Sequence, residues 1–160
     1  MTNMSRASLY QSYGGKEGLF LAAIAHYAKT RVAGVVAALG PQASLHDDLT
    51  AFYAKVVQLA TADPETLGCL ISCVLADVAG RNDVFRAELD RRFMAIELHL
   101  ADRFRHNGWT DAAPVPPAAA AGLAAAAARG IMLRARSGQT PAELTAIGNA
   151  AVTALVQLSA

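Results

Sequence analysis

Residues 5–20 read SRASLYQSYGGKEGLF and divide into two helices of unequal length. Ser5 is a favourable N-cap residue, so it predicts a short helix that begins there. The Gly14-Gly15 pair ends that helix, because glycine favours turns and disfavours helix interiors. From residue 16 to residue 39 the chain has no proline and has apolar residues near helical spacing, which predicts a second, longer helix.

The rest of the chain also contains residues that typically start or end helices. Gly40-Pro41 stops the long helix, and no stretch alternates apolar and polar residues as a strand would. Ser44, Asn82 and Thr140 are N-cap residues that each precede an apolar periodic segment. The sequence therefore predicts an all-α fold. It further predicts one helix that begins at Ser44 and four more over residues 68–79, 83–106, 118–136 and 141–159.

Composition supports the all-α prediction. Of 160 residues, 36 are alanine, 54% are hydrophobic and 17% are charged. Alanine is the strongest helix former, and so apolar a chain is not disordered. Two cysteines exclude a disulfide framework and a four-cysteine zinc site. The N-terminus lacks the apolar segment of a secretory signal, and no run of about 18 apolar residues occurs. We therefore expect a cytoplasmic protein that crosses no membrane.

No group of residues has the spacing of a catalytic or metal site. Cys69 and Cys73 lie in an apolar run without neighbouring histidines, so we interpret them as core residues. The four histidines lack metal-ligand spacing. The sequence contains no nucleophile elbow, glycine-rich phosphate loop or zinc motif. We therefore predict that the protein is not an enzyme and uses no metal or cofactor.

The short helix carries side chains suited to nucleic acid. Arg6, Ser8 and Gln11 are hydrogen-bonding residues, and such a helix can enter the major groove, which is about 12 Å wide. At Lys16 the ammonium group and the free N–H groups of the next helix can both meet a phosphate. Residues 1–40 contain four basic residues and one acidic residue, so the N-terminal end is the positive one.

The same segment resembles the recognition helix and the following helix of the TetR family of transcriptional repressors. The family pattern is Ser-x-x-x-Leu-Tyr-x-x-Tyr/Phe-x-x-Lys-x-x-Leu. Two later segments, GCLISCVLADVAGRNDVFRAELDRRF and RGIMLRARSGQTPAELTAIGNAAVTAL, resemble the regulatory domain of that family, so the resemblance covers nearly the whole chain. The pattern is met in this sequence at Ser5, Leu9, Tyr10, Tyr13, Lys16 and Leu19.

The resemblance implies a division into two regions. Residues 1–39 would hold a helix-turn-helix DNA-binding region, truncated at its front, and the connecting helix. Residues 40–160 would form a ligand-binding and dimerisation domain, with helices 118–136 and 141–159 pairing with their copies in a homodimer. Double-stranded operator DNA is the implied partner of the full-length form. The implied groove contacts are Ser5, Arg6, Ala7, Ser8 and Gln11, and the implied phosphate contacts are Tyr10, Tyr13 and Lys16.

A cavity between the middle helices is the implied ligand site. Its apolar and aromatic lining would suit a small hydrophobic ligand, although plain core packing explains each residue equally well. Ligand binding would tilt helix 16–39 and release the operator, as in a repressor. The candidate lining residues are Phe52, Tyr53, Val56, Leu70, Cys73, Val74, Phe93 and Met94.

The start of the sequence leaves an alternative open. A helix-turn-helix needs a helix before its recognition helix, and the TetR family has two, whereas residues 1–4 alone precede Ser5. We therefore expect roughly 30–40 further residues upstream in the DNA-binding form. The alternative is a small-molecule-binding or dimerisation protein that does not bind DNA by itself.

Overall fold

The computed structural model describes residues 5–159, and every regular element in that part of the chain is helical. The predicted all-α fold class is confirmed. Two of the elements, η1 and η2, are π-helices. The elements in chain order are α1 (Arg6–Tyr13), α2 (Lys16–Tyr27), η1 (Ala28–Val32), α3 (Ala33–Ala37), α4 (Leu45–Thr61), η2 (Leu70–Leu75), α5 (Ala76–Ala79), α6 (Asp83–His106), α7 (Pro117–Arg136) and α8 (Pro141–Leu158).

Four of the helices begin with a side-chain cap at the residue that the sequence predicts. The side-chain oxygens of Ser5, Ser44, Asn82 and Thr140 each accept a hydrogen bond from a backbone N–H group in the first turn. Thr140 and Glu143 bond each other reciprocally and complete a capping box at α8. Because each cap satisfies a donor that the helix itself cannot, the predicted starts of α1, α4, α6 and α8 are confirmed.

Two of the predicted α-helices contain a π-helical segment. The run predicted over residues 16–39 is helical from Lys16 to Ala37, but residues 28–32 form the π-helix η1. The helix predicted over residues 68–79 starts at Leu70, and its first part is the π-helix η2. A π-turn takes up an extra residue without breaking the helix. The apolar periodicity of the sequence does not reveal it.

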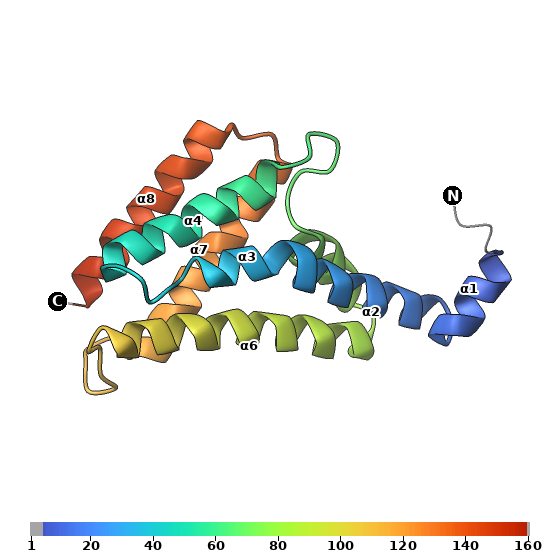
Figure 1. The fold of residues 1–160 in the computed structure, drawn as a ribbon, viewed down its shortest axis with the longest axis horizontal. Helices are drawn as coiled ribbons and strands as arrows, with labels where there is room; N and C mark the ends of the chain where they lie inside the picture. Colours follow the sequence, from blue (N-terminus) through green and yellow to red (C-terminus); the bar gives the residue numbers. More distant parts are fainter. Residues whose placement is uncertain (1–4, 160) are drawn as a thin grey trace.

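The core lies where α7 meets α4, α6 and α8. This helix packs against α4, α6 and α8, and α4 also packs against α8 (Figure 1). The face of α7 that includes Ala120, Ala121, Ala124 and Ala125 is fully buried. Small side chains let neighbouring helices approach closely, which explains why so alanine-rich a helix occupies the centre of the body.

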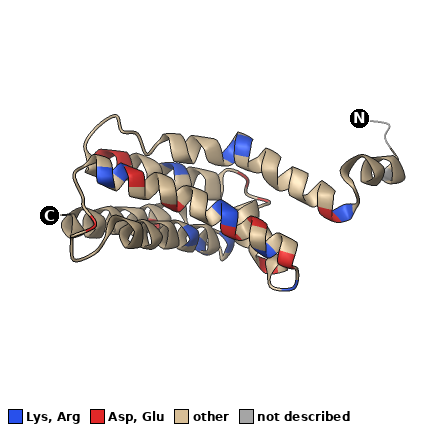
Figure 2. Cartoon of the chain, turned by 90° about the horizontal axis from the view of Figure 1, so that it is seen from below, with Lys and Arg blue, Asp and Glu red and all other residues tan. Residues whose placement is uncertain are grey.

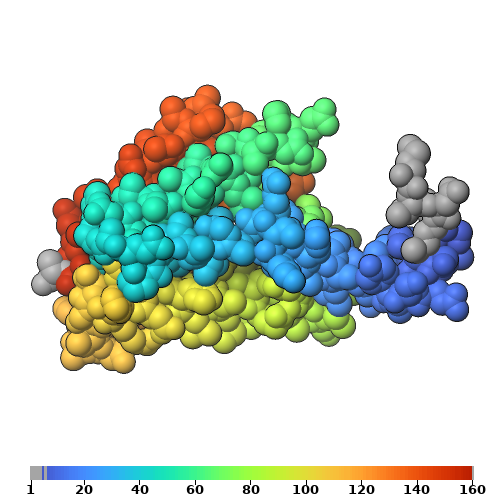
Figure 3. Space-filling view, in the orientation of Figure 1, coloured from blue at the N-terminus to red at the C-terminus, as the bar shows by residue number. Residues whose placement is uncertain are grey.

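The first helix stands apart from the body. α1 packs against α2 and lies at the far end of the helical run 16–37, whose other end contacts α4. Figure 1 and the space-filling view in Figure 3 show α1 projecting beyond the remaining helices. Over the body, lysine and arginine are interspersed with aspartate and glutamate (Figure 2).

Two helical runs among the described residues, 16–37 and 117–136, are long and apolar enough to cross a membrane by length and composition. The sequence argument sought an uninterrupted apolar run and did not find these segments, because each contains charged residues. Such helices are weak evidence for a membrane span. The second is α7, a core helix that packs against α4, α6, α8 and η2.

Candidate functional site

Most of the residues implied to contact DNA have exposed side chains on α1 or next to it. Tyr10 is half-buried on the same helix. Arg6 begins α1, and its side chain lies outside the described residues. These placements leave the contact with DNA a prediction. The exposed side chains are those of Ser5, Ala7, Ser8, Gln11, Tyr13 and Lys16.

The turn between α1 and α2 depends on glycine. Gly14 and Gly15 have φ angles of 71° and 110°, a region that residues with a Cβ rarely adopt. The Gly15 N–H group donates a 2.8 Å hydrogen bond to the carbonyl oxygen of Tyr10. A Cβ at Gly18 would lie 1.8 Å from the carbonyl oxygen of Tyr13. The end of α1 therefore rests directly on the first turns of α2.

Contacts near the start of α2 join it to the body. Asn82 Nδ2, at the start of α6, donates a 2.6 Å hydrogen bond to Glu17 Oε1. One turn further along, the rings of Phe20 and Phe85 meet edge to face with centroids 5.1 Å apart. A shift of α6 relative to α2 would therefore be transmitted to the helix that carries α1.

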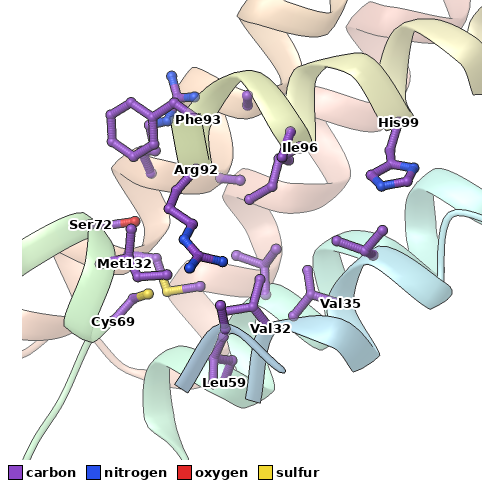
Figure 4. Close-up of a pocket in the computed structure, with 18 of the residues that line it drawn as sticks. Val32, Val35, Leu59, Cys69, Ser72, Arg92, Phe93, Ile96, His99 and Met132 are labelled. Carbon is purple, nitrogen blue, oxygen red and sulfur yellow. The ribbon is translucent and has the colours of Figure 1, made fainter. Parts of the chain in front are cut away.

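A cavity of about 180 Å³ lies between the helical run 16–37, α4, α6 and α7 (Figure 4). Its walls are mostly apolar side chains from all four elements and from the segment around η2. Polar groups reach it from Cys69, Ser72, Arg92, His99 and Arg129. The apolar lining residues labelled in Figure 4 are Val32, Val35, Leu59, Phe93, Ile96 and Met132.

The structure divides the candidate ligand residues into four groups. Phe52, Val56 and Phe93 line the cavity. Tyr53 faces the other side of α4, where its hydroxyl group donates a 2.9 Å hydrogen bond to the carbonyl oxygen of Ala124. Burial there raises the pKa of Tyr53 well above its usual value of 10.0. The side chain of Met94 is 51% exposed and does not line the cavity.

The remaining candidates line a separate, more polar cleft. Leu70, Cys73 and Val74 lie there with residues of α2, η1 and the loop before η2. At its edge, burial raises the pKa of Tyr27 well above its usual value, and the neighbouring Cys69 side chain adds to the shift. The predicted lining residues thus lie in two cavities, in the core and, for Met94, on the exposed surface.

Several residues that line the cavity were not predicted from the sequence. Val32 and Val35 belong to the connecting helix, which the sequence gives a purely mechanical role. Met132 belongs to a helix assigned to the dimer interface. Arg92 lies between the apolar positions of α6, a pattern that usually marks a solvated face. The sequence alone offers no signal that these positions meet in space.

Comparison with solved structures identifies the fold. A double cysteine mutant of the TetR family transcriptional regulator CifR, solved in complex with a 26-base-pair operator DNA, superposes with a TM-score of 0.80. The alignment covers 94% of this chain and 80% of that one, at 23% sequence identity. No family model and no curated protein matches the sequence. The chain therefore has the fold of a TetR regulator, and the predicted TetR-like architecture is confirmed.

Proposed function

We propose that this chain is a TetR-type transcription regulator, a repressor that binds double-stranded operator DNA and is released by a small hydrophobic ligand. One observation carries the proposal. The helical run 16–37 bears the exposed, polar α1 at one end, and with Val32 and Val35 it forms a wall of the cavity. A ligand that shifts this wall also moves α1.

In this proposal the regions keep their predicted roles. Residues 1–39 form the DNA-binding region with its connecting helix, and residues 40–160 form the ligand-binding and dimerisation domain. The protein is cytoplasmic and has no catalytic activity. Groove contacts come from α1, and Lys16 contacts a phosphate at the start of α2. Ligand binding changes the spacing of the two α1 helices of a dimer, and the two half-sites are no longer matched.

A homodimer through α7 and α8 supplies the second copy of α1. These helices leave leucines in solvent, with Leu123 and Leu133 on α7 more than half exposed and Leu158 on α8 38% exposed. An apolar surface of this kind is typical of subunit interfaces. Sedimentation should give a dimer at micromolar concentration. Leu133→Glu should produce monomers, whereas Val84→Glu, a change at an equally exposed residue on α6, should not.

The test of DNA binding uses protein isolated from its native cells to select duplexes from a random library. Bound duplexes are then titrated by fluorescence anisotropy between 50 and 200 mM salt. We expect affinity to fall steeply with salt because phosphate contacts release counterions. Lys16→Gln should weaken binding to all selected duplexes and lower the salt slope by about 1.

Lys55→Gln is the matched control. Lys55 is an exposed lysine on α4 that donates a hydrogen bond to Gln58, so its loss should leave binding unchanged. Failure to select any duplex would refute the proposal.

That failure would favour the second candidate function, a ligand-binding or dimerisation protein without a DNA role of its own. That candidate is supported by α1, which packs against α2 and is too short to be stable alone.

A further inference from the structure

Two guanidinium groups line the cavity between α3, α4, α6 and α7, and that of Arg92 leaves most of its hydrogen-bonding capacity unused. Arg92 Nε donates a 2.7 Å hydrogen bond to Glu88 Oε1, one turn earlier on α6. Among residues 5–159, Nη1 and Nη2 of Arg92 have no hydrogen-bond partner. Figure 4 shows this end of the side chain pointing into the cavity, toward Val32 and Leu59.

The charge near Arg92 is only partly balanced. Glu88 is the single carboxylate that pairs with both Arg91 and Arg92, at 2.7 Å in each case. Burial acts to raise the pKa of Glu88, but the hydrogen bonds from the two arginines outweigh it and lower the pKa. Two guanidinium groups therefore share one negative charge. The side chain of Arg91 is 63% exposed and is therefore solvated. That of Arg92 is 19% exposed and is therefore partly desolvated.

The other groups in the cavity add no negative charge. Arg129 is already engaged, because it donates a hydrogen bond to Glu97 and its guanidinium carbon lies 3.7 Å from the centroid of the Phe93 ring. Ser72 and His99 contribute further hydrogen-bonding groups, and no carboxylate is among the lining residues. A partly desolvated guanidinium group in such surroundings is best satisfied by a bidentate anion.

We propose that the cavity binds a small apolar carboxylic acid as its anion, with the carboxylate on Nη1 and Nη2 of Arg92 and the apolar body among Val32, Val56 and Ile96. That this acid is the regulatory ligand rests on the function proposed above. The cavity volume of about 180 Å³ limits the size of the acid. An engineered apolar cavity of about 150 Å³ holds benzene, so a single ring with one carboxylate matches the space.

Three probes of nearly equal shape test the charge preference. Benzoate is an anion at neutral pH, benzamide is neutral and benzamidine is a cation. Isothermal titration of the full chain should give a Kd for benzoate at least tenfold below that for benzamide, which corresponds to about 1.4 kcal/mol. Benzamidine should bind more weakly than either. This comparison uses the unmodified protein and does not depend on the folding of a variant.

Variants of Arg91 and Arg92 test which residue causes the preference for benzoate over benzamide. Arg92→Met keeps the apolar stem and should abolish the discrimination between benzoate and benzamide, and Arg92→Lys should retain part of it. Arg91→Met is the matched control, because Arg91 also pairs with Glu88 but does not line the cavity. Its discrimination should equal that of the unmodified chain.

Equal affinity for benzoate and benzamide, or binding of neither, would overturn the assignment. Discrimination that survives in Arg92→Met would overturn it as well. These results are separate from the DNA selection experiment. A chain that binds DNA but prefers benzamide remains a regulator with a different ligand class. A chain that binds benzoate through Arg92 but no DNA remains an acid-binding protein.

Discussion

The loop that joins the connecting helix to α4 is held by a buried ion pair. Arg103 Nε on α6 lies 2.8 Å from Asp48 Oδ2 on α4, with 4% and 5% of the two side chains exposed. Arg103 Nη2 donates a hydrogen bond to the carbonyl oxygen of Ala43 at 3.2 Å, and the N–H group of Gln42 donates to Asp48 at 3.3 Å. We predict that Asp48→Ala destabilises the fold strongly.

The magnitude follows from what Asp48→Ala leaves behind. Arg103 Nη1 is buried without a partner among the described residues, so the variant keeps a buried cation with one remaining hydrogen bond, to Ala43. Breaking a buried pair in this way costs about 3–5 kcal/mol. For a chain of this size each kcal/mol lowers Tm by roughly 2–4 °C. We therefore expect a fall of roughly 6–20 °C, measured by circular dichroism at fixed protein concentration.

A double-mutant cycle tests the physical reason. Asp48→Ala combined with Arg103→Met removes both charges, so the double variant should be more stable than Asp48→Ala alone. Asp102→Ala is the control, because the side chain of Asp102 is 74% exposed and lies 3.4 Å from Arg105. Its loss should cost at most about 1 kcal/mol. A cost below about 1 kcal/mol for Asp48→Ala, or strict additivity of the two changes, would refute the reasoning.

Three further predictions concern the rest of the fold. Gly18→Ala places a Cβ 1.8 Å from the carbonyl oxygen of Tyr13; amide exchange over residues 6–13 should rise while the Tm of the body stays unchanged, and protected amides would contradict this. Tyr53→Phe should cost about 0.5–1.5 kcal/mol in urea titrations at pH 7. Because burial raises the pKa of Tyr53 in the folded state, the unmodified chain should lose stability as pH rises above 10.0, by up to about 1.4 kcal/mol per pH unit for this group. The variant should show a shallower loss, and parallel profiles would count against the assignment. Thr140→Ala removes the capping box with Glu143 and should cost about 1 kcal/mol in thermal unfolding; an unchanged Tm would show that the cap does not hold α8.

The candidate site was only partly predictable. The segment from Ser5 to Lys16 could be placed on an exposed helix and turn because caps, glycines and polar side chains act locally. Phe52, Val56 and Phe93 could be assigned to a cavity because the resemblance to the TetR family implies one between the middle helices, where each is an apolar residue on a predicted helix. Tyr53 follows Phe52 in the sequence, yet it faces α8, since adjacent residues on a helix point about 100° apart. The direction of each face is set by the packing of the helices.

The sequence by itself determined the all-α class, the helix starts at Ser5, Ser44, Asn82 and Thr140, and the break before Lys16. These features depend on residues a few positions apart, so local hydrogen bonding and backbone preferences suffice. Only the tertiary structure decided the π-turns and the Asp48–Arg103 pair. It also decided that the free end of Arg92 enters the same cavity as Val32. The ion pair and the shared cavity join groups far apart in the chain, and their meeting depends on how the helices pack. The π-turns are local, but the apolar periodicity of the sequence does not reveal them.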